Sequence, residues 1–233
     1  MLFDPIKYYF KKIGCQHESI NEIAIGEKYV AVILQSGQIG VCATLDHPIE
    51  KIQPAFSPDL RRMSHRIVYT AYLNALLNYQ HEFDENKDIY DVISFEKYNH
   101  IVMIGHFKSL YQKFQKASIK LDVFDKAGTG EYLTDMGLQK KHLHSADAAI
   151  ITGTSMFNRT FPGLIKVIPK TSDIFILGPS TILDKRIFEK THVTALFGAV
   201  FDPHDRIVLK IIREGGGTPD FVDRMQKVFL LPD

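Results

Sequence analysis

The sequence predicts an α/β protein in which a small α+β unit precedes a doubly wound parallel sheet. Three observations predict this fold class. Strand-like segments lie close together in the amino-terminal third, apolar runs alternate with helical stretches from Tyr98 onward, and a polar, acidic stretch at 81–91 separates the two patterns. We therefore expect one domain over residues 1–85 and a second over residues 86–233.

Length and composition are those of an ordinary globular protein. The chain has 233 residues, of which 45% are hydrophobic and 24% are charged. Its formal net charge of +1 creates no overall field towards nucleic acid or anionic lipid, so we expect neither as a partner. Two cysteines, Cys15 and Cys42, do not indicate a disulfide scaffold. No apolar run approaches the ~20 residues of a membrane span and the first residues do not resemble a secretory signal, so we expect a cytoplasmic protein.

The amino-terminal unit is predicted to open with a helix over 6–13, which Asp4 and Pro5 begin as N-cap and first-turn residue. Three strand-like segments follow, with turn residues between them, and they predict an antiparallel meander. These segments are 23–25, 29–34 and 39–44.

A helical region is predicted next. Ser57-Pro58 is expected to open it, and Ser64 is expected to cap a longer helix that ends near Tyr79. The apolar stripe of this helix is expected to cover the meander. Asn74 lies off that stripe, so it either faces solvent or reaches across the domain junction into the crevice of the second domain.

The second domain is predicted to contain five buried strands that alternate with helices. Apolar, β-branched runs of this length fit strands that are buried on both faces, and such strands are usually parallel. Arg206–Ile212 is predicted to be a last strand and Asp220–Leu230 a closing helix, with the glycines at 215–217 as the link. The five predicted strands are 101–104, 119–124, 148–151, 174–177 and 195–200.

Three loops of small and polar residues directly follow three of these strands. Because the carboxyl ends of parallel strands meet at one edge of a sheet, we expect the loops to converge on a single ligand-binding crevice. Glycine lets the backbone approach a ligand, while Ser and Thr supply hydroxyls and cap the next helix, whose free N–H groups attract anions. The loops are Gly105-His106-Phe107, Thr152-Gly153-Thr154-Ser155 and Gly178-Pro179-Ser180-Thr181.

Single residues near these loops suggest chemistry. His106 is the catalytic candidate, because an imidazole at the mouth of the crevice can polarise a carbonyl, move a proton or bind a metal. Thr154 and Asn158 are expected to orient a substrate through a hydroxyl and an amide. Asp125 follows Gly105 by twenty positions, where nucleotide-binding folds place an acid on a ribose diol. The full glycine fingerprint is absent, so a tight turn and a solvated acid explain the same two residues.

The metal signals are weak, and no metal site is predicted. Cys15 and His17 lie close together, and His142 and His144 alternate in a segment that has the composition of a solvated surface. None of the motifs for nucleotide loops, serine hydrolases or zinc proteases is present. The cofactor is left unassigned.

Taken together, the loops resemble a known family. GHF at 105–107, the acid Asp125 at the end of the next strand, TGTSMFNRT at 152–160 and GPST at 178–181 are similar to the motifs of the "putative heavy-metal chelation" family. The resemblance implies an enolase-N-terminal-like domain followed by a Rossmann-like domain, with the active site between them. It also implies a role in making or handling metal-chelating, pterin-like or siderophore-like compounds. The chain departs from the family pattern at Lys108, Asp125 and Ile182.

Three functions remain open on the sequence. The first is an enzyme that condenses or hydrolyses a small polar heterocycle at the domain junction, with His106 as acid or base and the GPST loop holding an anionic end. The second is a non-catalytic carrier of a metal chelate, and the third is a domain that binds a nucleotide or S-adenosylmethionine through Asp125. A homo-oligomer is also left open. The expected ligand-binding residues are Asn74, Gly105, Phe107, Asp125, Thr152, Gly153, Thr154, Asn158, Gly178, Pro179, Ser180 and Thr181.

Overall fold

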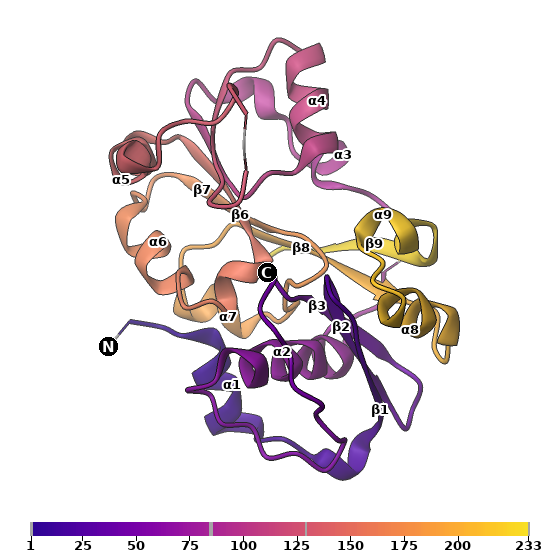
Figure 1. Ribbon diagram of the computed structural model, residues 1–233. Coiled ribbons are helices and arrows are strands. Elements are labelled where there is room, and N and C mark those ends of the chain that lie inside the picture. The colour runs from indigo at the N-terminus through magenta and orange to yellow at the C-terminus, as the bar shows by residue number, and fades with distance from the viewer. Residues whose placement is uncertain (1, 84–85, 129, 233) are drawn as a thin grey trace.

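Two sheets organise the computed structural model, which describes residues 2–83, 86–128 and 130–232 (Figure 1). A three-stranded antiparallel sheet has the order β1-β2-β3, and a six-stranded sheet has the order β5-β4-β6-β7-β8-β9, in which β9 pairs antiparallel with β8. The predicted fold class is confirmed. The strands are β1 Ile20–Ile25, β2 Tyr29–Leu34, β3 Ile39–Ala43, β4 Ile101–Ile104, β5 Leu121–Phe124, β6 Ala148–Thr152, β7 Asp173–Leu177, β8 Ala195–Phe201 and β9 Met225–Leu230.

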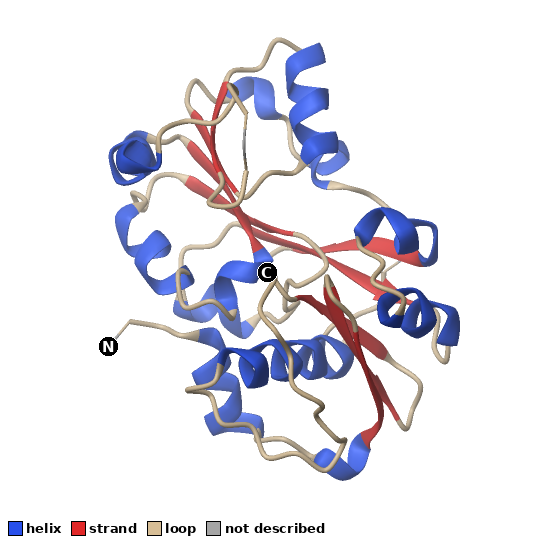
Figure 2. Ribbon diagram, viewed as in Figure 1, coloured by secondary structure: helices blue, strands red, loops and turns tan. Residues whose placement is uncertain are grey.

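Helices flank both faces of the larger sheet, with α3 and α4 on one side and α5, α6 and α7 on the other (Figure 2). Within the described part of the chain, no helix is both long enough and apolar enough to cross a lipid bilayer. The helices are α1 Pro5–Ile13, α2 Met63–Leu77, α3 Ile89–Val92, α4 Lys108–Lys116, α5 Gln139–Ser145, α6 Phe161–Val167, α7 Arg186–Lys190, α8 Arg206–Arg213 and α9 Thr218–Phe221.

The inner strand β4 shows why an unbroken apolar run is needed here. Successive side chains of a strand point to opposite faces of the sheet. Ile101 and Met103 accordingly belong to the core beneath α3 and α4, whereas Val102 and Ile104 belong to the core on the opposite face. Because both faces are covered, every residue of β4 is buried.

The small sheet is also covered on both faces. Val30 and Val32 of β2 face the core that contains α2, while Ala31 and Ile33 face a separate core that contains Val208, Leu209 and Ile212 of α8. Figure 1 shows α8 beside β1 and β2, although these segments are far apart in the chain. The carboxyl-terminal part of the chain therefore completes the packing of the amino-terminal sheet.

The last two predicted elements are wrong. The predicted strand at 206–212 is the helix α8, and the predicted helix at 220–230 is a short helix, a turn and the strand β9. The β-branched residues of α8 resemble a strand in composition, but Asp205 caps the segment by accepting a hydrogen bond from the N–H of Ile207, and one face of it is buried. β9 pairs with β8 over six residue pairs and so covers the edge of β8.

The helical region predicted at Ser57-Pro58 is wrong as well. Residues 51–62 form turns and irregular chain, and α2 begins at Met63, without a side-chain cap from Arg62. Two residues at the predicted domain boundary, 84–85, lie outside the described part of the chain.

Candidate functional site

A cavity of about 580 Å³ lies at the carboxyl ends of β4, β6 and β7. Its volume is typical of a site for a small organic ligand. β4 pairs with β5 on one side and with β6 on the other, so the chain leaves β4 and β6 in opposite directions across the sheet. Open α/β sheets bind ligands at such a switch point. All three predicted loops contribute to the lining, through His106 and Phe107, through 152–154 and through 178–180.

Apolar side chains form most of the remaining wall. They come from α3, from the start of α4, from the end of β7, from the first half of β8, from α9 and from β9. The contribution of β9 could not be predicted, because the sequence assigns that segment to a helix. The apolar lining residues are Ile89, Phe107, Leu110, Leu177, Pro179, Phe197, Pro219, Met225 and Val228.

The amino-terminal unit reaches the cavity through Tyr29. The Tyr29 hydroxyl lies 2.8 Å from the Thr218 hydroxyl, at the start of α9. Burial, offset in part by this hydrogen bond, raises the pKa of Tyr29 to about 12. The phenol therefore stays protonated at neutral pH and can donate a hydrogen bond. Every other described lining residue follows position 86, so the cavity is not shared equally between the two parts of the chain.

The first turn of α4 supplies positive potential. Lys108, Ser109 and Leu110 line the cavity, and the N-cap residue Phe107 has no side-chain hydrogen bond to this turn. The first N–H groups of a helix have no acceptor within the helix and carry partial positive charge. This end of α4 therefore offers donors and a favourable field to an anion in the cavity.

Charged side chains at the rim add to this field. Lys87, Lys108 and Lys227 are among the described lining residues, together with one acid, Asp88. The Asp88 carboxylate accepts a hydrogen bond from Lys113 at 2.8 Å and lies 3.5 Å from the Lys227 ammonium. Burial alone raises the pKa of Asp88, but the hydrogen bond from Lys113 and the charges of both lysines together lower it below its usual value. Asp88 is thus ionised, and the ammonium groups of Lys113 and Lys227 balance its charge.

His106 presents one ring nitrogen that the protein does not use. Its Nδ1 lies 3.1 Å from the Tyr132 hydroxyl, and the two rings pack with their centroids 4.7 Å apart. Its Nε2 is buried and has no hydrogen-bond partner among the described residues. His106 lines the cavity, but this nitrogen itself is covered by protein, so a ligand bonds to it only after the neighbouring side chains shift.

Asp125 does not line the cavity. One carboxylate oxygen accepts a hydrogen bond from the N–H of His106 at 2.7 Å, and the other accepts from the N–H groups of Ala127 and Gly128 at 2.8 and 3.1 Å. Three backbone donors hold this side chain between two loops. The arrangement orients the backbone of His106, and it gives no support to the predicted contact with a ribose diol.

The loop after β6 lines the cavity with its first residues only. Thr152, Gly153 and Thr154 line the cavity, and the two threonine hydroxyls lie 3.0 Å apart. Asn158 lies outside the lining, and its side-chain oxygen accepts hydrogen bonds from the N–H and hydroxyl of Thr160. The amide of Asn158 therefore closes its own turn instead of facing the cavity as expected.

Polar groups of the loop after β7 form hydrogen bonds to the amino-terminal unit. The Ser180 hydroxyl accepts a hydrogen bond from the N–H of Ala43 at 3.0 Å, and Thr181 is fully buried outside the cavity lining. Asn74 is 1% exposed and donates to the carbonyls of Val41 and Pro179 at 2.8 and 3.3 Å. Of the two interpretations of Asn74, the solvent-facing one is wrong, although the side chain meets the loop outside the cavity lining.

Comparison with known proteins identifies relatives of the whole fold. A family model described as "Putative heavy-metal chelation" matches residues 88–231. The chain is similar to a protein of unknown function from the DUF364 family of Pyrococcus horikoshii, with a TM-score of 0.81 and 19% identity over 99% of this chain and 100% of that one. It is also similar to a DUF364 protein of unknown function from Desulfitobacterium hafniense DCB-2, with a TM-score of 0.76 and 19% identity over 97% and 96% of the two chains. No curated protein matches the sequence significantly.

Proposed function

The chain belongs to the "Putative heavy-metal chelation" family, DUF364, and on that premise we propose that its cavity binds a small organic anion with a planar, apolar body. Organic metal chelators commonly have this form, in which a ring carries carboxylate or other oxygen and nitrogen donors. The observation that carries the proposal is the uncapped start of α4, which opens into a cavity with largely apolar walls.

Each wall of the cavity favours one part of such a ligand. Phe107 and Phe197 can contact a ring through their own rings, because aromatic side chains supply large apolar contact area. The first turn of α4 and the ammonium of Lys108 can bind a carboxylate, and a charged hydrogen bond contributes about 1.5–3 kcal/mol. The buried Nε2 of His106 has no partner among the described residues, and a small shift of its cover would let it bond to a ring heteroatom.

The same nitrogen bears on whether the protein is an enzyme. An imidazole within hydrogen-bond reach of a bound ring can move a proton to or from it, which suits condensation or hydrolysis of a heterocycle. A carrier would need the hydrogen bond alone. Binding is therefore the proposal, and turnover is a separate question that His106→Ala addresses once a substrate is known.

Among the described residues, no contact favours a nucleotide or S-adenosylmethionine in the same way. The acid expected to bind the ribose, Asp125, is occupied by three backbone N–H groups outside the cavity lining. The loop after β4 also has only Gly105 of the glycine fingerprint.

Calorimetric titration with charged and uncharged forms of one ring tests the proposal. We expect dipicolinate and a pterin carboxylate to bind, and dipicolinamide, which has the same ring without charge, to bind at least about tenfold more weakly. Added salt is expected to weaken the carboxylates, since Lys108 and the rim lysines are exposed to screening. Binding of ATP or S-adenosylmethionine alone, or of none of these compounds, would contradict the proposal.

Lys108→Ala gives the matching test on the protein. This change removes the ammonium at the start of α4, and we expect it to weaken dipicolinate binding by about three- to tenfold while leaving dipicolinamide unchanged. Lys116→Ala is the control, because Lys116 ends the same helix and does not line the cavity. Equal effects of the two variants would mean that the anion does not bind at the start of α4.

A further inference from the structure

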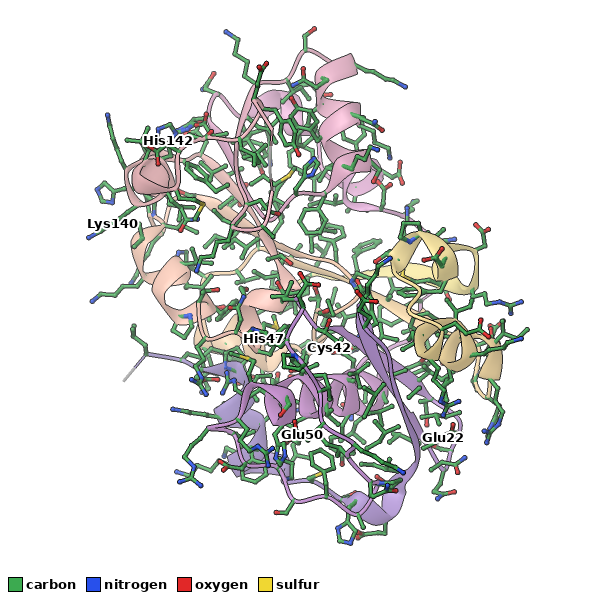
Figure 3. The ribbon with its side chains drawn as sticks, in the orientation of Figure 1. Glu22, Cys42, His47, Glu50, Lys140 and His142 are labelled. Carbon is green, nitrogen blue, oxygen red and sulfur yellow. The ribbon has the colours of Figure 1, made fainter. Side chains whose placement is uncertain are left out.

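A second cluster of ligand-type side chains lies near the opposite, amino-terminal ends of the same strands. His100 directly precedes β4, Asp122 lies in β5 and His142 lies in α5, which Figure 3 shows at the outer side of the molecule. The Nε2 atom of His100 is 2.8 Å from Oδ2 of Asp122, and Nδ1 of His142 is 2.5 Å from the same oxygen. The three ligand atoms all lie within 4.8 Å of one another.

The contact of the second ring nitrogen of His100 shows which nitrogen carries a hydrogen. Nδ1 lies 3.0 Å from the carbonyl oxygen of Ser145, which can only accept, so Nδ1 carries the hydrogen. In the neutral ring, Nε2 then directs a lone pair at the carboxylate of Asp122, which also only accepts. Two acceptors at this distance need a cation between them, either a proton on the ring or a metal ion.

The surroundings of His100 are those of a metal ligand. Metal-binding histidines almost always donate their other N–H to a carboxylate, a backbone carbonyl or water, which fixes the tautomer and the ring orientation. The carbonyl of Ser145 has this role for His100. The backbone is held as well, because the N–H groups of Asn99 and His100 both donate to one oxygen of Asp147 at 3.0 Å.

We propose that His100, Asp122 and His142 bind a divalent transition metal ion, with Zn²⁺ as the reference ion. Two imidazoles and a carboxylate are a common zinc ligand set, and three protein ligands leave a fourth position for water. With metal–ligand bonds of about 2.0–2.1 Å, two ligand atoms on a tetrahedral ion lie about 3.3 Å apart. The contacts to Asp122 would therefore open by about half an ångström or somewhat more.

That adjustment is open to these side chains, which are between 24% and 31% exposed. Such exposure also leaves an entry path for the ion. Histidine and carboxylate ligands without thiolates favour zinc or a neighbouring first-row ion over a soft heavy metal.

The proposed metal site is separate from the cavity. His100 precedes β4 and His106 follows it, and the rise of a strand places them roughly 15–20 Å apart. Loss of one site therefore leaves the other intact, and the two proposals can fail independently. The sequence does not reveal the cluster, because its members come from three separate parts of the chain. Of the three, only His142 stands out in the sequence, and it does so as a pair with His144.

Zinc titration of the full, tag-free chain after treatment with a chelator tests the proposal. We expect one equivalent of Zn²⁺ to bind, and Co²⁺ to give the intense visible d–d bands of a tetrahedral ion. Asp122→Asn and His142→Gln are each expected to weaken binding more than tenfold and to abolish the Co²⁺ bands. His144→Gln is the matched control, because His144 lies on the same helix outside the cluster, and it should bind as the unaltered chain does.

Two results would overturn the proposal. One is the absence of zinc binding by the unaltered chain. The other is zinc binding that Asp122→Asn and His142→Gln leave unchanged, because the ion would then sit on other histidines. Circular dichroism of each variant checks that it is folded, so that lost binding is not mistaken for unfolding.

Discussion

Replacing Arg66 with methionine is expected to lower the free energy of unfolding by about 3–5 kcal/mol. The Arg66 side chain has no exposed surface, and its guanidinium donates to the carbonyls of Phe157 and Met156 at 2.5 and 3.2 Å. It also pairs with the Asp4 carboxylate at 3.0 Å. Methionine fills similar space but leaves the two carbonyls without the donor from Arg66, and it leaves the Asp4 carboxylate with the N–H of Lys7 but without its cation. Urea denaturation measures the loss.

Arg61→Met is the control for Arg66→Met. Arg61 makes a comparable pair with Asp59 at 2.9 Å, but its side chain is 91% exposed. Exposed ion pairs contribute little to stability because water and salt screen them, so this variant should be nearly as stable as the unaltered chain. Similar losses for the two variants would show that burial of Arg66 does not determine its contribution.

Gly40→Ala is expected to destabilise the protein by about 3 kcal/mol or more. A Cβ atom at Gly40 would lie 2.1 Å from the backbone nitrogen of Ala75 and 2.2 Å from the carbonyl oxygen of Ala71. Both atoms belong to the main chain of α2, which cannot yield as a flexible side chain does. The helix must move away from β3, and the contacts of the core beneath it are lost. Thermal and urea denaturation both report this change.

Gly163→Ala should have the opposite sign. Gly163 lies within α6, and a Cβ atom there would meet nothing within 4 Å. Alanine is expected to stabilise the helix by about 0.5–1 kcal/mol, because glycine loses more backbone entropy on folding. If Gly40→Ala were as stable as Gly163→Ala, the close packing of α2 on β3 would be wrong.

The strands of the larger sheet could be predicted because their physics is local. Runs such as 101–104 and 148–151 are apolar on every residue, and their short length and β-branched content favour a strand covered on both faces over a buried helix. The meeting of the three loops follows from parallel pairing alone. The segment 206–213 could not be assigned in this way, because its β-branched residues are equally compatible with a strand. The cap from Asp205 and the packing of one face against the small sheet favour the helix.

The candidate site was harder to predict than the fold, because polar side chains have several uses. Asp125 and Asn158 have the residue types expected of ligand contacts, yet their hydrogen bonds close loops. Ser180 lines the cavity, but its hydroxyl accepts a hydrogen bond from the N–H of Ala43. Partners this far apart in the chain leave no signal in spacing. The uncapped start of α4 could not be predicted either. The sequence does not mark Phe107 as the N-cap residue, so it does not show that this helix begins without a side-chain cap.

Amide hydrogen exchange with and without saturating dipicolinate tests most directly whether an organic anion binds in the cavity. We expect the ligand to slow exchange at the start of α4, over 108–110, and in the loop 152–154, because these backbones line the cavity and the first N–H groups of α4 would donate to the carboxylate. Exchange around His142 should not change, because its cluster lies near the amino-terminal ends of the strands and the cavity lies at their carboxyl ends. Unaltered exchange over 108–110 at saturation, or protection confined to another part of the chain, would contradict the proposed function.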